Sequence, residues 1–359
     1  MAARVDILVV GGGPAGGAAA AEAARAGAGV VLVEAKRRLG ERPHCAEWVP
    51  RLLAREVEFP ERCVVQTTSN MVTIGPGFEA STPAPGFILD RGRFDHGLGE
   101  QAAGAGADIR CGARLVAWDQ GAATLKGPWG LEKIRADLVI AADGAASTVR
   151  RLMGLKAPRR LTGVGVEVPL VRPLDDTQVH FNPRWRHGYA WLFPKGPVAN
   201  LGLGLLEIRP GEAREALEDF RLEMIRREVI RPGCLGRSVG AIAVDGPEKS
   251  LIHDRVILTG DAAGLTHPIT GAGIPQAVIS GREAGRAAAA FIDQGDQAVL
   301  SAHDGNILDL YGATLAWGLG KRRHLENNWT SEPFPDLIAG TWPAFRKYRE
   351  NYHGRGRGA

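Results

Sequence analysis

The sequence is poor in cysteine and lacks a long apolar run. Its four cysteines, in a chain of 359 residues, include no Cys-x-x-Cys pair, which excludes a zinc ribbon and a small disulfide framework, so we expect no metal. No run of about 18 apolar residues is present, and we expect no membrane-spanning helix. The N-terminus lacks the charged, apolar and small-residue order of a secretory signal. We therefore expect a cytoplasmic protein in a reducing setting.

Glycine is the residue in excess. The chain has 48 glycines, about twice the usual share of roughly 7%. Glycine is used where the backbone needs a positive φ or must approach another group closely, so the question is whether these residues gather where a ligand would need them.

The net charge of +4 is less informative. Basic residues lie in clusters at 36–38 and 321–323 and in the tail at Arg355 and Arg357. These clusters are either solvated faces or sites for an anionic ligand or lipid surface. We expect no nucleic-acid partner.

The first 35 residues have the order strand, glycine turn, helix, strand and acid. Residues 6–10 are a continuous apolar run, which is typical of a buried parallel strand. A glycine-rich turn at 11–16 leads into an Ala-rich stretch at 17–26 with high helix propensity. A second apolar strand at 30–33 ends at Glu34. This order predicts a dinucleotide-binding βαβ unit.

Each glycine of this unit has a distinct task. Gly11 permits the tight turn, Gly13 lets backbone N–H groups approach a pyrophosphate, and Gly16 lets the helix pack on the strand. The positive end of the helix then faces the phosphates. Glu34 follows Gly16 by 18 residues and is placed to accept hydrogen bonds from ribose hydroxyls.

Two later strands also end in glycine turns. Residues 136–142 are apolar and precede Asp143-Gly144 and a helix start. Residues 254–259 form another apolar strand before a glycine-rich loop and an Ala-rich helical stretch at 275–292. Between these blocks, segments at 60–90 and 160–245 alternate as half-exposed antiparallel strands do. The chain reads as helical from about 300 and as looser after Pro333.

These glycine sites resemble the flavoprotein oxidoreductases with a glutathione-reductase-type FAD fold, in the para-hydroxybenzoate hydroxylase class. The resemblance implies that the first turn holds the ADP half of FAD, that Asp143-Gly144 lies near the pyrophosphate, and that Asp261 binds the ribityl chain, with the following loop along the flavin. The segment Leu89-Asp90-Arg91-x-x-Phe94-Asp95 resembles the family's element that places an arginine near FAD. The cofactor-binding residues expected in this way are Gly11, Gly13, Pro14, Ala15, Gly16, Glu34, Ala35, Arg91, Asp143, Gly144, Gly260, Asp261, Pro268, Gly271, Gly273 and Ile274.

The resemblance also implies an architecture. We expect an α/β fold in which a Rossmann-like FAD-binding domain is built from separated segments, with an inserted antiparallel β-sheet substrate domain and a helical C-terminus. The FAD-binding domain is expected at 1–60, 91–160 and 248–300, and the β-rich domain at 61–90 and 161–247. Residues 301–359 form the C-terminal helical region and tail.

The stretch Gly188-Tyr189-Ala190-Trp191-Leu192-Phe193-Pro194 closely resembles the Tyr-x-Trp-x-Phe-Pro signature of the geranylgeranyl reductase family. Alternation along a strand puts Tyr189, Trp191 and Phe193 on one face. That face either bounds a flavin and an extended apolar substrate or fills the core of the β-rich domain.

The segment 43–48, Pro-His-Cys-Ala-Glu-Trp, lies where the reductases carry a Pro-Cys-Gly-Gly or Cys-Gly-Glu element. Cys45 keeps the cysteine position and either lines the active site or is an inert buried thiol. Glu47 and His44 are lesser candidates for proton transfer. His267, which precedes Pro268 in the flavin loop, is either a proton donor or a loop histidine.

Three functions remain open at this stage. In the first, reduced FAD passes hydride to an isoprenoid C=C bond of a prenyl lipid, with peripheral membrane contact. In the second, the same fold is a flavin-dependent monooxygenase that hydroxylates an aromatic substrate, either free or as a tryptophan side chain of a partner protein. In the third, the fold binds FAD without catalysis. No second complete Gly-x-Gly-x-x-Gly unit is present, so NAD(P)H or another electron donor would act without its own Rossmann domain.

Overall fold

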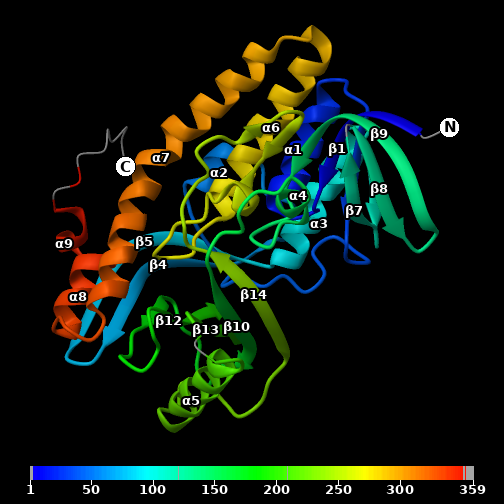
Figure 1. Ribbon diagram of the computed structural model, residues 1–359. Coiled ribbons are helices and arrows are strands. Elements are labelled where there is room, and N and C mark those ends of the chain that lie inside the picture. The colour runs from blue at the N-terminus through cyan, green and yellow to red at the C-terminus, as the bar shows by residue number, and fades with distance from the viewer. Residues whose placement is uncertain (1–2, 120, 208, 351, 353–359) are drawn as a thin grey trace.

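The computed structural model describes residues 3–119, 121–207, 209–350 and 352. Two β-sheets carry the fold, with helices packed on each (Figure 1). No helix of the described ranges is both long and apolar enough to cross a membrane. The α/β fold with a helical C-terminus expected from the sequence is confirmed.

The first sheet has parallel strands at its centre, in the order β15-β16-β9-β1-β2-β6, and the β7–β8 hairpin joins it through β9. Its inner strands are apolar and buried on both faces, as parallel strands are when both faces are covered. The strands are β1 (Ala3–Val10), β2 (Val30–Glu34), β6 (Asp108–Cys111), β7 (Arg114–Asp119), β8 (Ala122–Gly127), β9 (Gly130–Ala141), β15 (Ile252–His253) and β16 (Val256–Leu258).

One face of this sheet is covered by two helices that lie close together, one at residues 14–25 (α1) and one at residues 274–294 (α6) (Figure 1). A Cβ atom added at Gly281 would lie 2.2 Å from the Ala15 carbonyl oxygen, and one at Gly285 would lie 2.3 Å from that of Ala19. Only glycine permits so close an approach of the two backbones. The helices of this part of the chain are α1 (Pro14–Arg25), α3 (Arg91–Gly104), α4 (Thr148–Leu152), the 3-10 turn η1 (Gly260–Ala263) and α6 (Ile274–Gln294).

The second sheet has the order β14-β10-β13-β12-β11-β4-β5-β3. Its neighbours are antiparallel except β11 and β4. The strands are β3 (Trp48–Pro50), β4 (Val64–Gly75), β5 (Phe78–Leu89), β10 (Arg160–Pro169), β11 (Thr177–His180), β12 (Tyr189–Lys195), β13 (Val198–Leu205) and β14 (Gly236–Ala243). The sequence placed residues 48–50 with the FAD-binding segments, whereas β3 pairs with β5 in this sheet. The division into domains stays our proposal.

Helices cover both faces of the second sheet. On one face, α5 (Glu212–Arg226) packs against the leucines of β13. On the other, the aromatic residues of β12 meet the C-terminal helices. The expectation of half-exposed strands is therefore wrong for β13: Leu201, Leu203 and Leu205 are buried, and so are the glycines between them, because the Trp191 ring lies over Gly202.

The C-terminal region is more ordered than the sequence indicated. It contains α7 (Gln297–Asn328), α8 (Phe334–Thr341) and α9 (Arg346–Arg349), so the described residues after Pro333 include two further helices where a looser chain was expected. Leu337 and Ile338 anchor α8 in the aromatic cluster of the second sheet. The basic cluster 321–323 is not a uniform surface either, since Arg322 is 1% exposed. Arg355 and Arg357 lie outside the described residues.

The short helix α2 (Leu53–Glu56) lies between β3 and β4 in the chain.

Candidate active site

One large cavity, of about 1840 Å³, lies between the two sheets. Its walls include the glycine turns after β1, β9 and β16, the segment 43–48, and the aromatic face of β12. The flavin-type motifs and the aromatic strand are thus parts of one space.

The turn after β1 is built by its glycines. Gly11 has φ +102, and a Cβ atom there would lie 2.4 Å from the Ala142 carbonyl oxygen. A Cβ atom at Gly16 would lie 1.8 Å from the Gly11 carbonyl oxygen. Gly13 differs, because no atom lies within 4 Å of the place where its Cβ would be. The backbone is therefore packed at Gly11 and Gly16 and open toward the cavity at Gly13.

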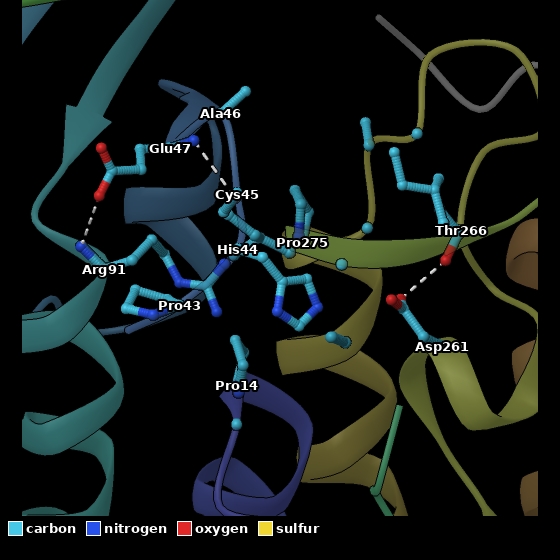
Figure 2. A pocket seen from close by; sticks show the side chains of 18 of the residues that line it. Pro14, Pro43, His44, Cys45, Ala46, Glu47, Arg91, Asp261, Thr266 and Pro275 are labelled. Atoms are coloured by element: carbon cyan, nitrogen blue, oxygen red, sulfur yellow. Dashed lines mark hydrogen bonds between the residues drawn. The ribbon is translucent and has the colours of Figure 1, made fainter. Parts of the chain in front are cut away.

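The N-terminus of α1 faces this opening. Gly13 is the N-cap residue and Pro14 the first helical residue, and no side chain caps the helix. Pro14 lies in the pocket beneath the 43–45 segment (Figure 2). The uncapped amides and the helix dipole favour an anion at this position.

Glu34 closes the other side of the turn. Its carboxylate accepts hydrogen bonds from the backbone N–H groups of Gly12 and Lys36, both at 2.8 Å. Glu34 and Ala35 line the cavity. The carboxylate is fixed at the end of β2, where its remaining lone pairs can accept hydroxyl groups of a ligand.

Asp143 and Gly144 form the turn between β9 and α4. The Asp143 carboxylate accepts hydrogen bonds from the Thr148 N–H at 2.6 Å and from the Ser147 hydroxyl. Burial raises the pKa of Asp143, and these hydrogen bonds oppose the rise. Gly144 has φ +77 and open space where its Cβ would be. Asp143 thus shapes the turn, and the Gly144 backbone is left facing the cavity.

The loop after β16 contributes Asp261 and the residues that begin α6. The Thr266 hydroxyl donates to Asp261 Oδ1 at 2.7 Å (Figure 2). A Cβ atom at Gly273 would lie 2.9 Å from the same oxygen. Gly271, Gly273 and Ile274 line the cavity, whereas Gly260 and Pro268 do not.

Arg91 approaches the cavity from the start of α3. Its guanidinium forms a buried, two-point ion pair with Asp95, with both N···O distances at 3.1 Å. Burial raises the pKa of Asp95 against the pull of Arg91. Figure 2 shows the Arg91 side chain reaching toward the segment that carries Cys45 and His44.

The aromatic residues of β12 share one face, as alternation predicted. Tyr189, Trp191 and Phe193 all line the cavity and belong to one cluster. The Tyr189 hydroxyl donates to the Thr270 carbonyl oxygen, and burial raises the pKa of Tyr189. The Trp342 ring lies 5.0 Å from that of Tyr189. The wall is both core and cavity lining, so the two interpretations of these residues do not exclude each other.

Cys45 lines the cavity and is half-buried. Its sulfur accepts a hydrogen bond from the Glu47 N–H at 3.2 Å. Burial raises the pKa of the Cys45 thiol, which favours the protonated form. His44 also lines the cavity, and its ring lies against Gly240 of β14; burial, with the charges of Lys36 and Arg91, lowers the pKa of His44.

His267 is placed differently from the other predicted catalytic residues. It does not line the cavity. Its Nδ1 accepts hydrogen bonds from the N–H groups of Ile269 and Thr270, and its Nε2 lies 3.3 Å from the Tyr348 hydroxyl. Burial lowers the pKa of His267 to about 4. Nδ1 thus binds the backbone of its own loop, whereas Nε2 lies against Tyr348 of α9.

Two polar residues of the site were missed by sequence reasoning. Lys195 forms an ion pair with Glu47, with Nζ 3.0 Å from each carboxylate oxygen. Asn200 donates to Glu47 at 3.1 Å and to the Cys45 carbonyl oxygen at 2.7 Å. Lys195 directly follows the Tyr-x-Trp-x-Phe-Pro stretch, but its partner lies 148 residues away in the sequence. No local pattern connects them.

Comparisons with known proteins agree with this architecture. The family described as pyridine nucleotide-disulphide oxidoreductase matches residues 5–179. Digeranylgeranylglycerophospholipid reductase 2 of Methanopyrus kandleri is 34% identical over 317 residues, which cover 81% of this chain and 78% of the relative.

Two solved structures share the fold. A geranylgeranyl bacteriochlorophyll reductase-like protein from Thermoplasma acidophilum has a TM-score of 0.85 at 23% identity, covering 98% of this chain and 100% of that one. A probable FAD-dependent monooxygenase from Pseudomonas aeruginosa has a TM-score of 0.72 at 20% identity, covering 94% and 99%. At these identities the structural similarity shows a common fold; it says nothing about a common reaction. The sequence match to the Methanopyrus reductase is the finding that decides the family. This chain is an enzyme that belongs to the geranylgeranyl reductase family of FAD-dependent oxidoreductases.

Proposed function

We propose that this enzyme reduces carbon–carbon double bonds in the isoprenoid chain of a lipid. The observation that carries the proposal is the single cavity that joins the glycine turns to the aromatic face of β12. Its volume of about 1840 Å³ exceeds the roughly 300–1,000 Å³ of an ordinary small-molecule site. A dinucleotide cofactor and a long apolar chain fit together in a space of this size. The name of the Methanopyrus relative supports a prenyl lipid as the substrate.

We propose that FAD occupies the half of the cavity beside the first sheet. The residues there fit a dinucleotide: Gly13 leaves space above an uncapped helix N-terminus, and Glu34 presents fixed carboxylate oxygens. Asp261 and Gly273 form a narrow polar edge that suits a hydroxylated chain. When bound and reduced by the electron donor, FAD would supply the hydride for the double bond.

The other half of the cavity suits the lipid chain. Tyr189 and Trp191 wall it, and the Tyr189 hydroxyl is engaged with the Thr270 carbonyl oxygen. Since that proton is held and the pKa of Tyr189 is raised by burial, we assign Tyr189 to shape rather than to proton transfer.

Reduction of a double bond also needs a proton, and we propose that the Cys45 thiol donates it. The thiol keeps its proton near neutral pH because burial raises its pKa. The Glu47 N–H occupies one side of the sulfur and fixes its position. Glu47 itself is tied to Lys195, and His267 lies outside the cavity, so neither is placed to donate.

The cavity has an exposed margin at α2 that suits lipid entry. Leu52 is 55% exposed and also lines the cavity. Arg51 and Arg55 flank it, and both are exposed. An apolar side chain between cations is the composition of a surface that contacts anionic lipid. We propose that the protein takes its substrate from a membrane surface here, and that the electron donor is NAD(P)H or a carrier without a Rossmann domain on this chain.

The test is turnover without oxygen. The FAD-loaded protein is reduced chemically under anaerobic conditions and mixed with digeranylgeranylglycerophospholipid in micelles, and the lipid is examined by mass spectrometry. We expect the mass gain of double-bond saturation. Absence of saturated lipid, together with oxygen-dependent hydroxylation of an aromatic compound or of a tryptophan in a protein, would show a monooxygenase instead.

Two cysteine variants test the proton donor. Cys45→Ser is expected to lower turnover by about 10²- to 10⁴-fold, the usual contribution of a positioned acid, with FAD still bound. Cys234→Ser is the matched control, because Cys234 is exposed and does not line the cavity. Equal turnover in the two variants would remove Cys45 from the mechanism.

A further inference from the structure

Glu47 is a buried charge to which the proposed reaction gives no task. It is 6% exposed and has φ +69, a backbone conformation that is costly for a residue with a side chain. Its carboxylate accepts both contacts of Lys195 Nζ at 3.0 Å. A buried carboxylate in a strained backbone persists only where its partners hold it firmly.

Asn200 links this ion pair to the cysteine. Its side-chain amide donates to Glu47 Oε2 at 3.1 Å and to the Cys45 carbonyl oxygen at 2.7 Å. Its side-chain oxygen accepts the Trp191 indole N–H at 2.9 Å. Asn200 lies on β13 directly opposite Phe193 of β12. The rigid hairpin of the second sheet therefore holds the segment that carries the thiol.

The left-handed backbone of Glu47 directs its N–H at the Cys45 sulfur, 3.2 Å away. The side-chain contacts of Glu47 fix that backbone. We propose that Glu47, Lys195 and Asn200 are a positioning cluster that holds the Cys45 thiol toward the cavity and controls its reactivity. The proposal rests on the proposed function only for the use of Cys45 in turnover.

The charges around Cys45 come from helix α3, from strand β12 and from the segment 43–48 itself. The Arg91 guanidinium of α3 favours the thiolate, and the Glu47 carboxylate opposes it. Lys195 of β12 neutralises Glu47, and the Tyr189 phenol of the same strand adds no charge while it is protonated. Removing one member of the ion pair leaves the other charge near the sulfur. The two removals must therefore shift the pKa of the Cys45 thiol in opposite directions.

The experiment measures iodoacetamide alkylation of Cys45 against pH in the full chain, resolved from the exposed Cys234 by peptide mass spectrometry. Glu47→Gln removes the carboxylate that opposes the thiolate and leaves the Lys195 ammonium paired with Glu167 at 3.5 Å, and we expect alkylation below pH 8 to be about five- to tenfold faster. Lys195→Met leaves an unpaired carboxylate, and we expect it to be slower by a similar factor. Glu167→Gln is the matched control, since Glu167 contacts Lys195 at 3.5 Å without contacting Cys45.

A double variant keeps the test decisive if a single charge loss prevents folding. Glu47→Gln combined with Lys195→Met removes both charges together, which a buried site tolerates better than losing one, and its rate should lie within about twofold of the wild type. Asn200→Ala should speed alkylation at every pH without moving the pH midpoint. Three results would each overturn the proposal. The first is a change of alkylation rate in the same direction for the two single variants, and the second is an unchanged rate in Asn200→Ala. The third is a rate change in the Glu167→Gln control as large as that in Lys195→Met. The alkylation experiment measures no turnover, so its result does not depend on whether the reductase assay succeeds.

Discussion

Gly13 offers the sharpest test of the cofactor half of the cavity. Its backbone φ of −81 is open to any residue, and no atom lies within 4 Å of a Cβ added there. Gly13→Ala therefore costs the folded protein only about 1 kcal/mol, the difference between glycine and alanine at a helix N-cap. The added methyl group points into the space above the α1 N-terminus, where we place the pyrophosphate. We expect a defect in binding without a defect in folding.

The size of that defect follows from the contacts it prevents. A hydrogen bond to a charged group contributes about 1.5–3 kcal/mol, so displacing a phosphate from one such amide lowers FAD affinity about 10- to 100-fold. Gly16→Ala must behave differently, because its Cβ would lie 1.8 Å from the Gly11 carbonyl oxygen. That overlap destabilises the fold itself, by about 3 kcal/mol or more.

The assay combines FAD titration, followed by quenching of flavin fluorescence, with thermal unfolding of the apoprotein. Gly104→Ala is the matched control: Gly104 is exposed at the end of α3 with open space around its Cβ position, so its variant should bind FAD as the wild type does. Wild-type affinity in Gly13→Ala, or equal destabilisation in Gly13→Ala and Gly16→Ala, would refute the assignment of this turn to the cofactor.

Buried polar groups support three further predictions. Tyr189→Phe leaves the Thr270 carbonyl oxygen without its donor, and we expect urea denaturation to show a free energy of unfolding lower by about 1–3 kcal/mol. An unchanged midpoint would mean that the hydroxyl does not hold the loop that contains Thr270. Arg91→Met leaves the buried Asp95 carboxylate unpaired, with an expected cost of about 3–5 kcal/mol by the same method, most of it recovered when Asp95 is replaced by Leu as well. Burial lowers the pKa of His267 from 6.5 to about 4. Between these two pH values the unfolded chain therefore binds more protons than the folded chain. The contribution of His267 to stability is complete above about pH 6.5 and is lost as the pH falls toward 4. His267→Gln should reduce the proton uptake on unfolding near pH 5 by about one proton. The measurement is the slope of the free energy of unfolding against pH, and a slope equal to that of the wild type would contradict this reasoning.

The half of the cavity in which we propose the cofactor could be outlined from the sequence because its signals are local. Gly11, Gly13 and Gly16 lie within one turn, and Glu34 follows at the end of the next strand. Spacing within a single βαβ unit fixes their geometry with few alternatives, since the helix must pack back on its strand. The later turns at Asp143 and Asp261 follow strands that pair in parallel near β1, so their ends reach the same edge of the sheet.

Other features depended on contacts that periodicity does not contain. His267 lies in the loop after β16, where the sequence left a proton donor and a loop histidine both open, and its ring turns to its own backbone and to Tyr348 of α9. Arg322 reads as part of a basic surface but is buried against Glu326, 2.7 Å away. Helix α8 was missed because a proline-rich segment gains its stability from tertiary packing rather than from propensity.

By itself, the sequence determined the fold class, the flavin-type motifs and the aromatic face of β12, because each depends on residues close together in the chain. The tertiary structure alone decided which charges meet at Cys45, which helix closes the aromatic wall, and that both halves share one cavity. Glu47 and Lys195 meet across 148 residues, and Trp342 reaches Tyr189 from the end of α8. Contacts of such separation arise when separately patterned faces are buried against each other, and local spacing carries no record of which faces will meet.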